Sequence, residues 1–269
     1  MLDKTKERWP EMDIKYLVLE EDDFMVCIDS EMVVDWNTNE KFQGHKDETK
    51  HNGVLNRMAL LESIPIYALH EQIRLSYKRM LGEAIARSLS GDYNNALNIL
   101  DAAETFITSR NGELARTWYL SASGVTTGLL VLLSLPLWFG RVTVKCMIGE
   151  VLFWLMIASI AGAVGAMFSV IMRMGNAKLD CSAGMKLHIL ESISRIAAGM
   201  ISALLVGLTI YSGVLLPALA QTGNKRAFIV LAALVAGASE RWAPSLIEHV
   251  EKRTKVAGLK QQLSGGGNE

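Results

Sequence analysis

Charged residues follow an apolar stretch near the C-terminus, where they would lie at membrane depth. Residues 227–238 are uncharged and apolar, and Ser239, Glu240 and Arg241 come directly after them. A charged side chain inside a bilayer is costly, so it usually faces protein or water and often marks an ion path. Gly237, Ser239, Glu240 and Arg241 are therefore candidate pore or membrane-embedded residues. The alternative is an interfacial Glu–Arg pair that anchors the end of a helix.

A second charged pair precedes another apolar stretch. Glu191 and Arg195 are four residues apart, a spacing that places both side chains on one face of a helix and allows them to pair. Because they lie next to an expected membrane segment, we regard Glu191 and Arg195 as a candidate gating ion pair.

A basic stripe with one aromatic residue lies further toward the N-terminus. Such a stripe could hold a short oligonucleotide by contacting its phosphates and stacking on its bases. The candidate oligonucleotide-binding residues are Arg74, Tyr77, Lys78, Arg79 and Arg87. The alternative is a solvated helix face beside acidic residues, and the acidic charge of the surrounding region opposes phosphate binding.

We find no pattern typical of an active site. The sequence has no G-x-S-x-G, H-E-x-x-H, P-loop or G-x-G-x-x-G motif, and its five histidines do not cluster with cysteines or carboxylates at metal-ligand spacing. His45 and His51 lie in a polar stretch and are expected to be solvated. The three cysteines are expected to be reduced and structural. We therefore expect no enzyme activity, no metal and no cofactor.

The charge of the chain divides it into two parts. Residues 1–115 contain 13 Lys and Arg against 21 Asp and Glu, a net charge of −8, whereas residues 116–269 have a net charge of +7. This asymmetry indicates two environments rather than one core. We expect a mainly α fold, in which a polytopic helical membrane protein with four membrane segments carries an N-terminal cytosolic α(+β) domain containing a helical hairpin.

The first 65 residues are the hardest to interpret. Three short runs rich in β-formers, at 16–19, 24–28 and 31–36, predict either a small strand meander or an extended arm that folds on a partner. Residues 37–53 are polar and are expected to form a loop.

Helical periodicity begins at Asn56, with a break at Pro65. Residues 66–115 are expected to form a helical hairpin that turns at Gly91 and Asp92, either an ordinary hairpin or a single tetratricopeptide-type unit. Asn111-Gly112 is expected to interrupt its second helix.

The remainder is expected to be a transmembrane domain at 116–250 followed by a flexible cytosolic tail at 251–269. Residues 117–139 contain no charge in 23 residues, which gives a helix of about 34 Å, enough to cross a hydrocarbon core of about 30 Å. The last segment has too short an apolar stretch to span alone, so it either continues past Arg241 or re-enters. The expected membrane segments are 117–139, 146–172, 196–219 and 227–247.

Small residues recur at four-residue steps in two of these segments, as in Ala158, Gly162 and Ala166. Such spacing allows two helix backbones to approach closely in lipid. It predicts either a seam between subunits or at a pore, or packing within one subunit.

Positive charge sets the expected topology. With four crossings, eleven Lys and Arg residues flank the side that holds the N-terminal domain, and four flank the other side. Together with the lack of an apolar signal sequence at the N-terminus, this predicts that both termini are cytoplasmic.

Three stretches carry a family resemblance, at 115–120, 187–195 and 236–247. Over about residues 80–250 the chain resembles the membrane effectors of the Hailong anti-phage defence system. The resemblance implies a multi-pass protein of the bacterial inner membrane that forms a homo-oligomer, a homotetramer, with an ion channel. It also implies that DNA oligomers made by a partner nucleotidyltransferase bind the soluble domain and hold the channel shut.

The sequence therefore predicts an oligomeric membrane effector in antiviral defence, an ion channel or pore gated by a ligand at its cytosolic domain. The alternative is a non-conducting membrane scaffold that anchors a partner-binding domain.

Overall fold

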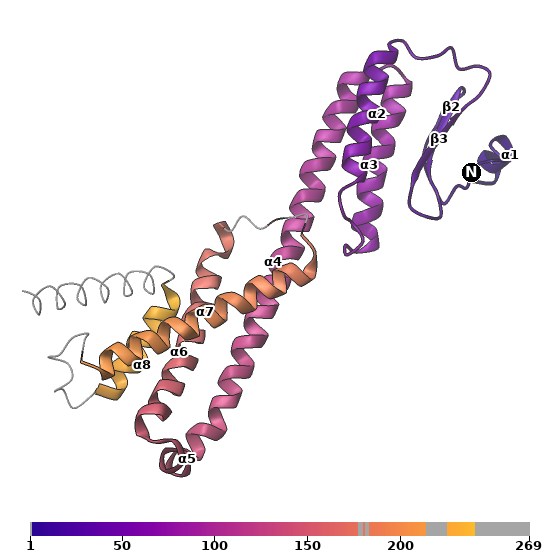
Figure 1. Cartoon of the computed structure of the whole chain (residues 1–269). Coiled ribbons are helices and arrows are strands. Elements are labelled where there is room, and N and C mark those ends of the chain that lie inside the picture. Colours follow the sequence, from indigo (N-terminus) through magenta and orange to yellow (C-terminus); the bar gives the residue numbers. More distant parts are fainter. Residues whose placement is uncertain (1, 177–179, 181–182, 214–224, 240–269) are drawn as a thin grey trace, which may run out of the picture. The chain divides into compact units, whose positions relative to one another are not determined.

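The computed structural model describes residues 2–176, 180, 183–213 and 225–239 (Figure 1). The chain is mainly helical, with one small sheet near the N-terminus. It divides into two compact units, an N-terminal unit of Met1–Ala115 with Leu179–Ser182, and a second unit of Arg116–Lys178 with Ala183–Glu269. The division falls within one helix, α4 (Tyr93–Phe139).

The sheet of the N-terminal unit is a three-stranded antiparallel meander, the first of the two alternatives that the sequence left open. Its strands are β1 (Tyr16–Glu20), β2 (Phe24–Ile28) and β3 (Val34–Thr38), in the order β1-β2-β3. The third strand begins later than the expected run at 31–36. Residues up to Val33 form a turn in which the Asp29 carboxylate accepts a hydrogen bond from the Val33 N–H at 2.7 Å.

Strand β2 is buried on both faces. Phe24, Val26 and Ile28 face the helices of the unit, whereas Met25 and Cys27 pack against Trp9 and Ile14, which follow the short helix α1 (Leu2–Arg8). Successive side chains of a strand point to opposite faces, so a continuous apolar run predicts burial on both sides.

Three helical stretches cover one face of this sheet: α2 (Glu48–Glu62), α3 (Glu71–Leu89) and the beginning of α4. Helix α2 begins earlier than Asn56, so the expectation of a loop through Gly53 is wrong for its last residues. The reason is the Asp47 side chain, which caps the helix by accepting a hydrogen bond from the Lys50 N–H. Pro65 lies between α2 and α3, where the sequence placed a break.

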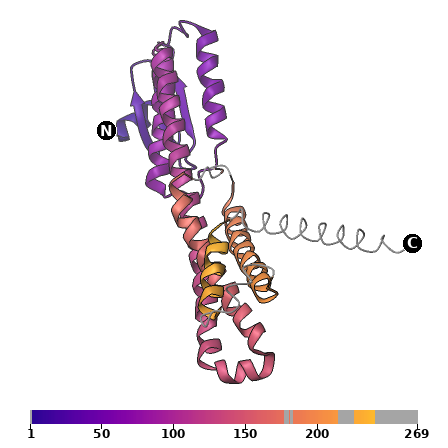
Figure 2. The ribbon, with the colours of Figure 1, turned by 90° about the vertical axis from the view of Figure 1, so that its left-hand side faces the viewer.

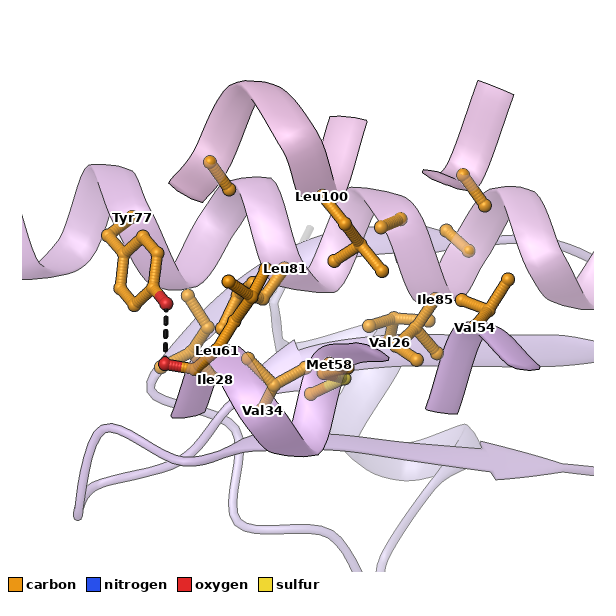
Figure 3. Close-up of a cluster of buried hydrophobic side chains, with 14 of the residues drawn as sticks. Val26, Ile28, Val34, Val54, Met58, Leu61, Tyr77, Leu81, Ile85 and Leu100 are labelled. Atoms are coloured by element: carbon orange, nitrogen blue, oxygen red, sulfur yellow. Dashed lines mark hydrogen bonds between the residues drawn. The ribbon is translucent and has the colours of Figure 1, made fainter. Parts of the chain in front are cut away.

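The core between sheet and helices is formed by large apolar side chains, among them Val26, Leu81, Ile85 and Leu100 (Figure 3). Tyr77 is fully buried there, and its hydroxyl donates to the Leu61 carbonyl at 2.8 Å. This carbonyl lies in the last turn of α2 and also accepts from the Ile64 N–H at 3.0 Å, so the tyrosine adds a further, buried donor that ties α3 to α2.

Helix α4 runs without interruption through Asn111 and Gly112, so the expected break at this point is wrong. The Asn111 side chain is buried and donates to the Pro65 carbonyl at 3.0 Å. Because it binds a distant carbonyl, it does not compete for the hydrogen bonds of its own helix.

The second unit contains the rest of α4, α5 (Arg141–Ile148), α6 (Glu150–Arg173) with the 3-10 turn η1 (Met174–Asn176), α7 (Met185–Tyr211) and α8 (Lys225–Ala238). Within the described residues, α4, α6 and α7 are long and apolar enough to cross a membrane. These three helices are consistent with a multi-pass membrane protein. Helix α8 has a shorter apolar stretch, and residues 214–219 and 240–247 of the expected segments lie outside the described residues.

The expected second segment does not start at Cys146. Gly149 separates α5 from α6 with a φ of +86°, a backbone conformation that favours glycine, so α6 starts at Glu150.

Helices α6, α7 and α8 lie side by side and meet at four glycines, Gly162, Gly165, Gly199 and Gly237 (Figures 1 and 2). A Cβ atom added to Gly237 would lie 2.0 Å from the Gly162 carbonyl oxygen, and one added to Gly199 would lie 2.5 Å from the Ala166 Cβ. One added to Gly165 would lie 2.0 Å from the Leu234 carbonyl oxygen. The small-residue seam of α6 is therefore used for packing within this chain.

Candidate functional site

A buried polar cluster joins α4 to α7 within the second unit. The Ser123 and Ser192 hydroxyl oxygens are 2.6 Å apart, and both lie within hydrogen-bonding distance of the Tyr119 carbonyl oxygen, at 2.8 and 3.1 Å. The Tyr119 carbonyl can only accept, so the two serine hydroxyl protons are shared among three acceptor oxygens: this carbonyl and the two serine hydroxyl oxygens. Ser123 and Ser192 are fully buried, which makes these bonds costly to break in an apolar surrounding.

Arg195 extends this cluster by one helical turn. Its guanidinium donates to the Tyr119 hydroxyl oxygen at 3.3 Å, and its side chain is half-buried. Glu191, its predicted partner in a gating ion pair, is exposed on the same helix. Arg195 thus contacts Tyr119 on α4, an interaction that the sequence did not predict.

His188 lies one turn before Ser192 and is 1% exposed. Its ring centroid is 6.2 Å from that of Trp118. Neither ring nitrogen has a hydrogen-bond partner among the described residues. Tyr119, Ser123, His188, Ser192 and Arg195 together are called the α4–α7 polar site below.

Spacing in the sequence contained a signal for this site. His188, Ser192 and Arg195 follow one face of α7 at steps of four and three residues, and Tyr119 and Ser123 are four apart in α4. Each serine alone carries no functional signal, and only the packing of α4 against α7 joins the two.

Of the pore candidates at the end of α8, two are described. Gly237 is buried at the helix crossing, where its Cα approaches Gly162, so within this chain it packs rather than lines a water path. Ser239 is half-buried, and its N–H donates to the Val235 and Ala236 carbonyls. Glu240 and Arg241 lie outside the described residues.

The five oligonucleotide candidates of α3 do not share one surface. Tyr77 is in the core, and Lys78 is 8% exposed and paired with Glu62 at 2.7 Å, so neither faces an incoming ligand. Arg79 is exposed, Arg74 is half-buried, and Arg87 is exposed and paired with Glu83 at 3.1 Å. The stripe is broken because α3 turns its aromatic side toward the sheet and α2.

His45 and His51 are not both solvated as expected. Their rings stack with centroids 3.6 Å apart, and His51 is buried with its Nδ1 atom 2.8 Å from the Ser88 hydroxyl oxygen. Burial, followed by the nearby His45, lowers the pKa of His51 below its usual value. The fold therefore favours the neutral form of the His51 ring.

An acidic depression of about 840 Å³ lies beside β1, lined by Thr5, Arg8 and residues 17–23. Arg8 there is 3.5 Å from Glu20 and 3.7 Å from Asp22. Because Glu21 and Asp23 also line the depression, four carboxylates face this one cation, and the depression does not favour phosphates. Among the described residues, no group of three or more His, Cys, Asp or Glu is arranged to hold a metal ion.

Comparison with family models, with curated proteins and with solved structures finds no match.

Proposed function

We propose that this chain is an oligomeric membrane pore, gated by a ligand at its N-terminal unit, of the kind found in the Hailong defence system. The observation that carries the proposal is helix α4. It begins in the core of the N-terminal unit at Tyr93 and continues, unbroken in the described residues, through the apolar stretch that ends at Phe139. A ligand that changes the N-terminal unit therefore acts on an element that also belongs to the membrane unit.

The α4–α7 polar site is the proposed receiver of this change. Its hydroxyls sit where α4 enters the second unit, and the Tyr119 carbonyl holds α7 through Ser192. If α7 moves away from α4, both bonds of Ser192, to Ser123 and to the Tyr119 carbonyl, are lost together, and these joined and separated states are the bistable element that gating requires.

The packing of α6, α7 and α8 supports the proposal of an oligomer. At the glycine crossing the backbones are too close for a side-chain carbon, so water has no path between these three helices. In this proposal the conducting path therefore forms between chains. Helix α4 offers a surface for this contact, since most of its apolar stretch is exposed in the single chain.

In this proposal four copies assemble in the bacterial inner membrane with cytoplasmic termini, and a fourth crossing includes α8. DNA oligomers from a partner nucleotidyltransferase are the proposed ligand. The exposed or half-exposed cations of α3 that remain for phosphate contact are Arg74, Arg79 and Arg87.

The test is ion flux from liposomes that contain the purified full-length chain, with and without short DNA oligomers. We expect flux without the oligomer, closure when it is added, and a several-fold shift in the closing concentration for Ser192→Ala. Ser194→Ala is the matched control, since Ser194 is exposed and donates only to the Leu190 carbonyl of its own helix. No flux from the unaltered chain in any condition, or equal shifts for the two variants, would refute the proposal.

The second candidate function, a non-conducting scaffold, is favoured by exposed apolar residues in the N-terminal unit. Tyr67 is 74% exposed and Leu60 is 64% exposed, as expected for a surface that a partner protein covers. A chain that binds such a partner but carries no ions in liposomes would support this alternative.

A further inference from the structure

Three basic and three aromatic residues gather where α5, α6 and α8 begin, all within the second unit. The Arg141 guanidinium lies 5.4 Å from the Trp138 ring centroid, and the Lys145 ammonium lies 5.1 and 5.2 Å from the ring centroids of Phe153 and Trp154. The Arg226 guanidinium lies 5.7 Å from the Trp154 ring centroid. We call this group the basic–aromatic cluster.

The cluster keeps an excess of positive charge. Arg226 pairs with Glu150, which is the one carboxylate that the structure places against these cations within the described residues. Arg141 and Lys145 are held over aromatic faces, which attract a cation but do not neutralise it. Three cations against one carboxylate leave two positive charges for an anion from outside the chain.

The same region exposes large apolar side chains. Phe139 at the end of α4 is 82% exposed, and Val142 and Met147 of α5 are each 79% exposed. Helix α5 has no buried residue, and its eight residues combine these apolar side chains with Arg141 and Lys145. A short helix of this composition lies at a membrane interface, with its cations at headgroup level and its apolar side chains in the acyl region.

Trp138 and Trp154 support this depth. Their rings pack edge to face with centroids 6.5 Å apart, and tryptophan is enriched at the boundary between hydrocarbon and headgroups. The Trp154 indole nitrogen is buried and has no hydrogen-bond acceptor among the described residues, so the cluster also contains a donor that a headgroup oxygen would satisfy.

We infer that the basic–aromatic cluster binds the phosphate headgroup of an anionic phospholipid. A lipid fits better than a free anion because it satisfies both features at once, the uncompensated charge and the exposed apolar surface of α5. The inference rests on membrane insertion and does not depend on channel activity.

The test measures binding of phosphatidylglycerol and phosphatidylcholine to the full-length chain in neutral detergent by native mass spectrometry. For the double variant Arg141→Gln, Lys145→Gln we expect the affinity for phosphatidylglycerol to fall about thirtyfold, from the usual contribution of two basic residues near anionic lipid. The matched control, Arg173→Gln with Lys186→Gln, removes the same charge from exposed positions elsewhere in the unit and should bind like the unaltered chain.

The charge-conserving variant Arg141→Lys, Lys145→Arg guards against a loss caused by misfolding, and it should retain binding. Equal affinity for the two lipids would overturn the inference, as would an equal loss in the control variant. Displacement of phosphatidylglycerol by an equal concentration of soluble glycerol phosphate would also overturn it, because the cluster would then be a site for free anions.

Discussion

The closest approach of the membrane helices makes a sharp prediction for Gly237→Ala. The added Cβ would lie 2.0 Å from the Gly162 carbonyl oxygen and 2.7 Å from the Gly162 Cα. Ordinary van der Waals contact begins at 3.4 Å, so α6 and α8 would have to separate by about 1.4 Å at this level. The obstacle is backbone rather than a flexible side chain, so no rotamer change relieves it.

We expect Gly237→Ala to destabilise the membrane unit by about 3 kcal/mol, the upper part of the usual range for overpacking. The separation would also weaken the contacts of Ala233 and Ala236, which are buried against α6 and α7. Gly128→Ala is the matched control, since its Cβ would meet nothing within 4 Å. In that control, alanine is expected to stabilise the helix by up to about 1 kcal/mol.

The assay is thermal unfolding of the two variants in the same detergent, followed by loss of the folded peak in size-exclusion chromatography. The midpoint of Gly237→Ala should fall by several degrees, whereas that of Gly128→Ala should stay or rise. If both variants unfold at the temperature of the unaltered chain, the close crossing of α6 and α8 is wrong. Water could then also pass between these helices within one chain.

Two further predictions concern the N-terminal unit. Tyr77→Phe should lower the free energy of unfolding by about 1 kcal/mol, because the Leu61 carbonyl loses one of its donors and keeps the Ile64 N–H, and chemical denaturation of the full-length chain would show the change. His51 has a lowered pKa, so below the ordinary histidine pKa of 6.5 the unfolded chain binds the proton more readily than the folded chain. Stability should therefore be complete above that pH and decrease as the pH falls through the lowered pKa. His51→Asn should flatten this pH dependence, and an unchanged slope would contradict the assignment.

Much of the architecture follows from the sequence because it depends on the solvent around each segment. The uncharged stretch at 117–139 is too long and too apolar for an ordinary soluble helix, and the acidic first part of the chain differs from the basic second part. Burial of β2 likewise follows from its unbroken apolar run. These are properties of single segments, so they do not require knowledge of what each segment touches.

The tertiary structure decided everything that depends on which face of a helix meets which neighbour. Arg74, Tyr77 and Lys78 lie close together in sequence, yet Tyr77 turns into the core while Lys78 pairs with Glu62. Ser123 and Ser192 form one polar site although 69 residues separate them. Helical periodicity places residues on a face, but packing alone chooses the partner of that face, because the apolar helices of a membrane unit resemble one another in composition.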